Sequence, residues 1–161
     1  MIDIYMIMPK QSAGILLYKF DNNQPLVFLV HPGGPFWRNK NEGAWSVPKG
    51  EFTEDENILQ AARREFEEET GQKITGDFVQ LDPVRQKSGK LVYVWAVEGD
   101  INAEKIISNT FDMEWPPRSG KMINIPEVDK GGWFDAATGR KLINAGQVPL
   151  IDNLLRLLKI N

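Results

Sequence analysis

The chain has 161 residues, of which 42% are hydrophobic and 25% are charged, a balance typical of one soluble globular domain covering residues 1–161. It contains no cysteine, which excludes disulfide bonds, thiolate metal sites and cysteine nucleophiles and agrees with a location in the reducing cytoplasm. The net charge of -3 provides no basic field for a large nucleic acid, and the apolar residues 1–8 are too short to span a membrane.

The first third of the chain predicts a hairpin followed by a long loop. Residues 1–8 are either a first strand or a loose end. Residues 12–20 and 25–30 are rich in strand formers and flank an Asp-Asn-Asn-Gln segment, which favours a turn. Gly, Pro, Asn and charged residues dominate residues 31–43 and predict a long loop. Residues 44–47 are a short strand candidate.

A long helix is expected in the middle of the chain. A Pro-Lys-Gly segment first ends the short strand candidate. Thr53 and Glu56 have the spacing of a capping box, in which each side chain bonds to the backbone of the other residue. A helix is therefore predicted from about residue 54 to residue 70, with Gly71 as the left-handed residue that ends it.

The second half of the chain predicts a second hairpin, an irregular segment and a terminal helix. Residues 77–86 and 90–97 are apolar-rich runs on either side of a Ser-Gly turn. Residues 102–121 contain Trp-Pro-Pro, which excludes a central strand and predicts irregular structure. The last expected elements are a strand and two helices, at residues 132–135, 136–143 and 149–160. Strands on both sides of one long helix predict an α/β or α+β sandwich.

The central helix carries a stripe that begins apolar and ends in carboxylates. At 3.6 residues per turn, one helix face collects Ile58, Ala61, Ala62, Glu65, Glu68 and Glu69. The opposite face is polar, so the stripe is expected to turn toward the protein. The carboxylates repel one another and lie at the helix end where the dipole disfavours anions, and their burial would add a large desolvation cost.

A divalent cation would offset this cost. Arg64 is able to pair with Glu68 four residues away, but one arginine cannot neutralise three carboxylates. Carboxylate oxygens suit Mg²⁺ or Mn²⁺, which proteins commonly hold with a few carboxylates, water and substrate phosphates. The competing interpretation is a charged, solvated helix end, which is the usual origin of a glutamate run.

The segment around this helix resembles the Nudix box, the pattern G-x5-E-x7-R-E-U-x-E-E-x-G-U in which U is a bulky aliphatic or aromatic residue. Reading from Gly50, the chain has Glu56 after five residues and, after seven more, Arg-Glu-Phe-Glu-Glu-Glu-Thr-Gly ending at Gly71. Gln72 departs from the pattern, which expects an apolar residue there. The family's opening strand, approach to the box and late segment are loosely similar to residues 12–17, 45–50 and 126–134.

The resemblance implies a fold and a set of metal ligands. The fold is an α/β/α sandwich with a mixed β-sheet, the box helix and a C-terminal helix. The implied metal ligands are three carboxylates and one carbonyl, those of Glu65, Glu68, Glu69 and Gly50. Arg64 would orient the glutamates. Glu56 has two interpretations of equal weight, a capping residue or a contributor to the metal site.

The implied activity is Mg²⁺- or Mn²⁺-dependent hydrolysis of a phosphoanhydride bond in a nucleoside-diphosphate-linked substrate, by attack of a metal-activated water. The proton acceptor is either Glu65 or a glutamate in the loop before the last strand, for which Glu114 is the residue to test. A solvated loop acid is the competing interpretation of Glu114. Two other classes compete: a Nudix-fold nucleotide-binding or regulatory module without hydrolysis, and a structural domain whose acidic helix meets a basic partner.

Substrate residues are expected near the box and in loops. Lys49 stands where many relatives have glycine or glutamine, and Pro-Lys-Gly resembles some hydrolases of dinucleoside polyphosphates. Trp37 is able to stack on a base, with loop packing as the alternative. Arg38 and Arg118 are able to contact phosphates, with plain solvent exposure as the alternative. The expected partner is a small nucleotide, a dinucleoside polyphosphate or nucleoside triphosphate, and not a large nucleic acid or a membrane. The apolar stripe of the last helix leaves monomer and homodimer open.

Overall fold

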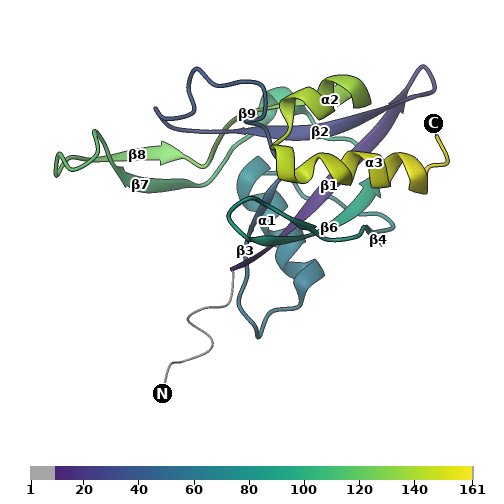
Figure 1. Cartoon of the computed structure of the whole chain (residues 1–161), viewed down its shortest axis with the longest axis horizontal. Helices are drawn as coiled ribbons and strands as arrows, with labels where there is room; N and C mark the ends of the chain where they lie inside the picture. Colours follow the sequence, from purple (N-terminus) through teal and green to yellow (C-terminus); the bar gives the residue numbers. More distant parts are fainter. Residues whose placement is uncertain (1–9, 161) are drawn as a thin grey trace.

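The computed structural model describes residues 10–160, which form a mixed β-sheet with helices on both faces and a ribbon that projects from one side (Figure 1). The sheet order is β4-β6-β1-β2-β9, with β3 beside β1 and β5 beside β6. Its strands are β1 (Gln11–Asp21), β2 (Gln24–Pro32), β3 (Lys49–Glu51), β4 (Val79–Gln80), β5 (Val84–Arg85), β6 (Leu91–Glu98) and β9 (Val128–Asp135). The possible first strand at residues 1–8 lies outside the described residues.

Strand β1 organises the sheet because it pairs with three neighbours. It runs parallel to β6 and antiparallel to β2 and β3. The predicted β1–β2 hairpin is confirmed, and its turn residues Asn22 and Asn23 have φ angles of 50° and 62°. Asparagine tolerates this left-handed region, and two such residues match the twist of a tight hairpin. The predicted second hairpin is also present, but its first arm is broken into β4 and β5, which both pair with β6.

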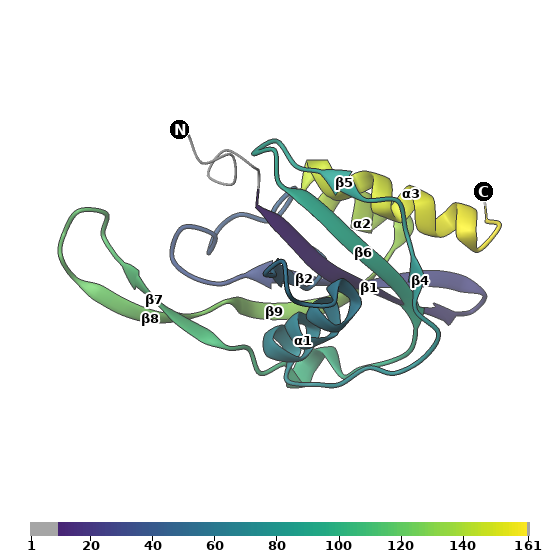
Figure 2. The ribbon, with the colours of Figure 1, turned by 90° about the horizontal axis from the view of Figure 1, so that it is seen from below.

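Two core layers confirm the predicted α/β/α sandwich. Helix α1 (Ile58–Thr70) covers one face of the sheet, and α2 (Ala136–Leu142) and α3 (Val148–Leu157) lie on the other (Figure 2). The layer beneath α1 includes Ala13, Ile15, Leu17, Ala62 and Phe66. The opposite layer includes Leu16, Val27, Leu29, Leu150, Ile151 and Leu154. Alternate residues of β1 thus enter opposite layers, as the two-residue period of a strand requires.

Helix α1 begins later than its sequence predicted. The prediction of a start near residue 54 is wrong, because Asn57 caps the helix by accepting a hydrogen bond from the Gln60 amide at 3.0 Å. Thr53 and Glu56 form a separate turn before it, in which the Thr53 amide donates to the Glu56 carboxylate at 3.1 Å. At the other end Gly71 has a φ of 74° and ends the helix as predicted.

The segment before α1 also differs from the prediction. Residues 48–50 were expected to end the preceding short strand, but Lys49–Glu51 form strand β3, whose Gly50 pairs with Ala13 of β1. The short strand expected at residues 44–47 is reduced to isolated bridges, between Val30 and Ser46 and between Trp45 and Ile143. This pairing with β1 places Gly50 beside the Glu65 carboxylate of α1.

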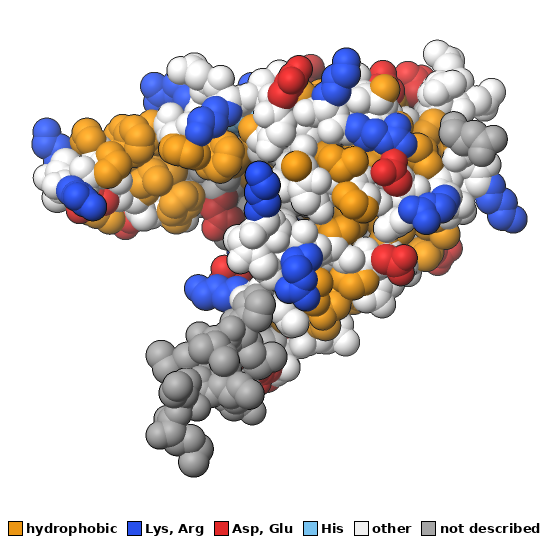
Figure 3. Space-filling view, in the orientation of Figure 1, with side chains coloured by type: hydrophobic (Ala, Val, Ile, Leu, Met, Phe, Trp, Pro, Cys, Tyr) orange, Lys and Arg blue, Asp and Glu red, His pale blue; other side chains and the backbone are white. Residues whose placement is uncertain are grey.

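Residues 102–121 were predicted to be irregular, but part of this segment forms a strand. Thr110–Glu114 form β7, which pairs with β8 (Met122–Pro126) in a separate two-stranded ribbon. The Trp-Pro-Pro segment lies in the turn of this ribbon and not in a central strand, as the sequence predicted. The ribbon projects beyond the sheet, and apolar side chains gather on it (Figure 3). Phe111 and Met122 are among its exposed hydrophobic residues.

The C-terminal elements agree with the sequence. Strand β9 starts at Val128, four residues before the predicted start, and α2 follows it with Asp135 as the N-cap. Helix α3 has Pro149 in its first turn, where a missing amide proton costs nothing. Within residues 10–160, no helix is both long and apolar enough to cross a lipid bilayer.

Candidate metal site and substrate cavity

Three glutamates from two elements converge at the end of the box helix. Glu65 and Glu69 come from α1, and Glu127 comes from the junction between β8 and β9. One carboxylate oxygen from each lies within 4.8 Å of the other two. Glu65 and Glu69 are each only 7% exposed, which confirms the predicted inward orientation for these two carboxylates, whereas the side chain of Glu68 in the same stripe is 34% exposed. Three converging carboxylates, two of them buried, are able to hold a hard divalent cation.

Gly50 makes room for this cluster. A β-carbon at residue 50 would overlap the Glu65 carboxylate. The antiparallel pairing of β3 with β1 fixes the Gly50 backbone at this place. The absence of a side chain at residue 50 therefore allows a buried carboxylate to lie directly against a strand backbone.

The charge of the cluster is not balanced by the protein alone. Burial raises the pKa of Glu69 to about 8, the charges of Glu127 and Glu65 act in the same direction, and Lys49 opposes them. Burial also raises the pKa of Glu65, with a further increase from the charge of Glu68. The pKa of Glu127 is raised by burial and by Glu68. A site that makes ionised carboxylates this unfavourable fits a cation, which would stabilise their charged form.

Arg64 connects the remaining acidic residues of the box. Its guanidinium donates to Glu65 at 2.9 Å, to both oxygens of Glu68 at 3.2 Å and to Glu56 at 3.1 Å. Glu56 also accepts from the Thr53 amide, so its contacts join the turn before α1 to Arg64. The structure does not bring Glu56 or Glu68 into the three-carboxylate cluster. The structure thus shows Arg64 in contact with Glu65, the glutamate that it was predicted to orient.

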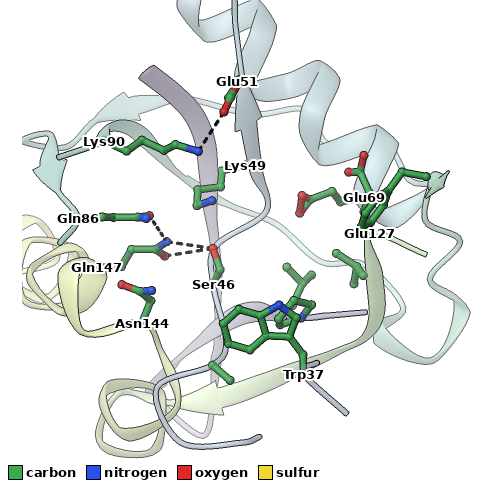
Figure 4. A pocket seen from close by; sticks show the side chains of 15 residues that line it. Trp37, Ser46, Lys49, Glu51, Glu69, Gln86, Lys90, Glu127, Asn144 and Gln147 are labelled. Carbon is green, nitrogen blue, oxygen red and sulfur yellow. Dashed lines mark hydrogen bonds and ion pairs between the residues drawn. The ribbon is translucent and has the colours of Figure 1, made fainter. Parts of the chain in front are cut away.

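A cavity of about 620 Å³ opens beside the cluster, within the usual size range of small-molecule sites. Glu69 and Glu127 line one side of it, and Gln86, Asn144 and Gln147 line the other (Figure 4). The two ends are therefore different in chemistry, one anionic and one neutral and polar.

Lysines and aromatic rings also line the cavity. Lys49 and Lys90 both contribute to the lining, and Lys90 donates to Glu51 at 3.2 Å. Burial lowers the pKa of Lys49, whereas the Glu69 carboxylate favours the charged form. Trp37 and Phe111 add aromatic surface. Cationic and aromatic groups in one cavity are suited to a ligand with both phosphates and a flat ring.

His31 connects the loop that carries Trp37 to strand β9. Its ring is fully buried, with Nδ1 at 2.9 Å from the Asp129 carboxylate and Nε2 at 2.6 Å from the Lys40 carbonyl oxygen. Asp129 is two residues beyond Glu127. The same side chain thus holds the aromatic side of the cavity and the segment that supplies the third glutamate in a fixed relation.

Several candidate residues from the sequence do not reach the cavity. Glu114 lies on the ribbon, four residue pairs, or about 13 Å, beyond the pair formed by Thr110 and Pro126. Its carboxylate accepts a hydrogen bond from the Arg118 amide at 2.7 Å within the ribbon turn. Arg38 is exposed and, like Arg118, is not part of the cavity lining. Trp37 and Lys49 are the proposed substrate residues that the structure places there.

Sequence reasoning missed Glu127 as a member of the carboxylate cluster. The signal was present, because residues 126–134 resemble the family's late segment and Glu127 immediately precedes the last strand.

The structure also explains why Gln72 departs from the box pattern. Its side chain donates to the Asn102 carbonyl at 3.0 Å and accepts from the Asn102 amide at 3.1 Å. These two hydrogen bonds fix the chain after α1 in place of an apolar contact.

The fold and the site together define a class of protein. In this class a mixed sheet lies between two helical layers, and a carboxylate-bearing helix borders a cavity. The sequence profile described as the NUDIX domain matches residues 8–153. The chain therefore belongs to the Nudix family.

Relatives in sequence match part of the chain. It is 41% identical over 70 residues to the mRNA-decapping protein g5R of African swine fever virus, a match that covers 42% of this chain and 25% of that protein. It is 37% identical over 75 residues to Nudix hydrolase 7 of Arabidopsis thaliana, covering 47% of this chain and 24% of that protein. The chain thus spans about a quarter of the length of these curated relatives.

Solved structures match nearly the whole chain. A binary complex of a C. elegans Ap4A hydrolase has a TM-score of 0.65 at 19% identity, covering 93% of this chain and 98% of the other. The NUDIX domain of Shewanella oneidensis NrtR, complexed with ADP ribose, has a TM-score of 0.65 at 18% identity, covering 98% and 94%. At this level of identity, the two structures confirm the fold.

Proposed function

We propose that this protein is a pyrophosphohydrolase that uses Mg²⁺ or Mn²⁺ to cleave a phosphoanhydride bond in a nucleoside-diphosphate-linked substrate. The observation that carries the proposal is the convergence of Glu65, Glu69 and Glu127 within 4.8 Å, beside a cavity that Lys49 also lines. Buried carboxylates next to a lysine-lined cavity bring together the groups that a metal ion and a phosphate chain require.

The residues of the proposed site divide into those that would hold the cation, one that positions them and one that would contact the phosphate chain. Glu65, Glu69 and Glu127 would hold it, with the Gly50 carbonyl as a further ligand. A bound divalent cation would supply the positive charge that acidifies water and offsets charge on phosphoryl oxygens. Arg64 orients Glu65 through their hydrogen bond of 2.9 Å. Lys49 provides a positive charge for the phosphate chain from within the cavity.

We assign the proton acceptor to Glu127 or Glu65. Glu127 has the position that was sought in Glu114, a glutamate just before the last strand. It is less buried than Glu65 and Glu69, so it is accessible to a water molecule at the edge of the cluster. Its raised pKa, caused by burial and the charge of Glu68, also favours acceptance of a proton.

A small nucleotide is the proposed partner. The relatives are named for mRNA decapping and Ap4A hydrolysis, and another is complexed with ADP ribose, so each name includes a nucleotide or an RNA. A cavity of about 620 Å³ accommodates a nucleotide, and the overall charge of -3 does not favour a long nucleic acid. A cytoplasmic location, in keeping with the lack of cysteine, belongs to the same proposal.

The test is a hydrolysis assay across nucleoside triphosphates, dinucleoside polyphosphates, nucleotide sugars and ADP-ribose. Each substrate is measured with Mg²⁺, with Mn²⁺ and with chelator. We expect metal-dependent product release for at least one substrate and none with chelator. A binding or regulatory module would bind nucleotides without turnover in the whole panel. A structural domain with an acidic helix would neither bind nor hydrolyse them, and either outcome would overturn the proposal.

A further inference from the structure

The neutral end of the cavity is built from three amide side chains that lie far apart in the sequence. Gln86 follows β5, Asn144 follows α2, and Gln147 ends the turn before α3. All three line the cavity on the side away from Glu69 and Glu127 (Figure 4). Gln147 is fully buried, whereas Gln86 and Asn144 are partly exposed to the cavity. An amide oxygen that faces the cavity here would bind a hydrogen-bond donor of the ligand, and an amide nitrogen would bind an acceptor.

The orientation of Gln147 is set by a backbone group. The Val47 amide can only donate, and it lies 3.1 Å from Oε1 of Gln147. This contact requires the Gln147 oxygen on that side and therefore turns its nitrogen the other way. Nε2 of Gln147 then donates to the Ser46 hydroxyl at 3.0 Å and to Oε1 of Gln86 at 3.1 Å. A buried backbone amide thus fixes the first member of a short amide chain.

The same logic fixes the two amides that face the cavity. Gln86 uses its oxygen to accept from Gln147, so its Nε2 is directed away from Gln147. Asn144 uses its oxygen to accept from the Gly146 amide at 3.0 Å, which leaves its Nδ2 free. Among residues 10–160, neither Gln86 Nε2 nor Asn144 Nδ2 has a hydrogen-bond partner. This wall of the cavity therefore presents two amide donor groups, Gln86 Nε2 and Asn144 Nδ2, whose oxygens are already bonded to the protein.

We propose that these two amide donors bind the O6 and N7 edge of a 6-oxopurine base, so that the substrates are guanine-type nucleotides. The proposal rests on the proposed function, whose substrate class it narrows. Guanine presents two adjacent acceptors, O6 and N7, along this edge, whereas adenine presents the N6 amino donor beside N7. Two donors complement the first edge and repel the amino group of the second.

The alternative ligand for two donors is a phosphate group, and charge argues against it. Gln86, Asn144 and Gln147 are neutral, whereas the lysines of the cavity are Lys49 and Lys90. A phosphate chain is best placed between those lysines and the carboxylate end, where a cation would also lie. The base is then directed to the amide end, with the Trp37 ring available for stacking.

The experiment compares GDP, IDP and ADP in binding titrations with chelator present, so that no turnover intervenes. GDP and IDP share the O6 and N7 edge, and IDP lacks the 2-amino group of guanine. We expect both to bind roughly 5- to 150-fold more tightly than ADP, the discrimination of one good bidentate contact. Rates of hydrolysis of GTP, ITP and ATP with Mg²⁺ are measured in parallel.

Two variants convert donors into acceptors. In Gln86→Glu and Asn144→Asp, the atom that faces the cavity becomes a carboxylate oxygen, and we expect the ratio of GDP to ADP affinity to fall toward one or below it. Gln60→Glu adds the same charge on the exposed face of α1 and is expected to leave the ratio unchanged. Circular dichroism spectra establish that each variant is folded.

The outcomes separate this proposal from the one on which it rests. Equal affinity for GDP, IDP and ADP would overturn the base assignment, even if all three triphosphates are hydrolysed. An unchanged GDP to ADP ratio in both cavity variants, with all affinities lowered together, would show that the amides contact phosphate and would also overturn it. A guanine preference without metal-dependent hydrolysis would support the base site while refuting the proposed enzyme.

Discussion

The two ends of the cavity solve opposite physical problems. At one end Glu65, Glu69 and Glu127 gather negative charge that the surrounding protein leaves unfavourable, as the raised pKa values of all three show. At the other end Gln147 is fully buried but has all its polar atoms engaged by Ser46, Val47 and Gln86. The first end would be completed by the proposed cation, whereas the second is already ordered by hydrogen bonds within the protein.

This difference separates reactivity from selectivity. A charged cluster that needs a cation is suited to chemistry at phosphorus, because the same cation stabilises the reacting oxygens. A neutral wall of fixed donors contributes little driving force but discriminates strongly, since a mismatched ligand leaves buried polar groups unpaired. Changes at the carboxylate end should therefore lower turnover for every substrate, and changes at the amide end should alter the choice among substrates.

The largest effect is expected from Glu69→Gln. The change keeps the shape of a side chain that is 7% exposed but removes a negative charge from the cation site. We expect kcat/KM to fall by about 100- to 1000-fold, the loss typical of one key electrostatic group. The metal-free variant should be at least as stable as the parent, because a buried carboxylate has been replaced by a neutral group. Steady-state kinetics and thermal denaturation test both statements.

Glu67→Gln is the matched control, since Glu67 is exposed on the same helix. It should retain the parent kcat/KM within about twofold, because surface charges contribute little. Equal losses in the two variants would contradict the inward orientation of the carboxylate stripe.

The next effect concerns the third glutamate. Glu127→Gln should lower kcat/KM by about 10- to 1000-fold, because it removes a cluster carboxylate that is also a candidate proton acceptor. Glu114→Gln should have little effect, since its carboxylate bonds to the Arg118 amide in the ribbon turn. Parallel kinetic measurements decide between them. A large loss in Glu114→Gln alone would return the proton acceptor to the ribbon.

The contrast between Glu114 and Glu127 shows how far sequence could predict the site. Glu65 and Glu69 were recognisable because four residues along a helix place two side chains on one face. Glu127 joins them only through the fold, and identifying it required knowing that β7 and β8 form a ribbon that carries Glu114 away. Trp-Pro-Pro signalled a turn but did not reveal the strands on either side.

The amide end was beyond sequence reasoning for a stronger reason. Ser46, Gln86 and Gln147 are brought together by contacts between residues 61 to 101 positions apart, and none belongs to a periodic pattern. Neutral amides also carry no charge signal. The sandwich itself was predictable because strand alternation and the α1 stripe are local, whereas the α1 start was displaced by a better cap at Asn57.

A smaller effect is expected from Gln147→Leu, which tests the order of the amide end. The variant leaves the buried Val47 amide without its acceptor, so the free energy of unfolding should fall by roughly 1–3 kcal/mol. Gln86 also loses the partner that fixes its amide, so the GDP to ADP affinity ratio should fall while turnover at the carboxylate end changes less. Chemical denaturation and nucleotide titrations measure the two effects.

Gln60→Leu is the control for Gln147→Leu, because Gln60 is exposed on α1 and its change should cost no more than about 0.5 kcal/mol. Unchanged stability and an unchanged nucleotide ratio in Gln147→Leu would mean that the amide chain does not order this wall.

The smallest expected signal is the proton released when metal binds. Because burial raises the pKa of Glu69 to about 8, this carboxyl is mostly protonated at neutral pH without metal and must ionise to hold a cation. Metal titrations in buffers of different ionisation enthalpy should show about one proton released near pH 7, falling toward zero as the pH rises above about 8. Glu69→Gln should lose this component, and proton release that is independent of pH and of Glu69 would contradict it.

The same pKa predicts how the metal-free protein responds to pH. A carboxyl with a folded-state pKa above its ordinary value of 4.5 favours folding most when protonated, so its contribution to stability declines as pH rises from about 4.5 through about 8. The metal-free protein should therefore melt at a lower temperature at pH 9 than at pH 6, and Mg²⁺ should reverse part of that loss. Glu69→Gln should flatten the dependence. The carboxylate end thus makes the metal-free protein less stable as the pH rises, whereas the amide end has no titrating side chain among Gln86, Asn144 and Gln147.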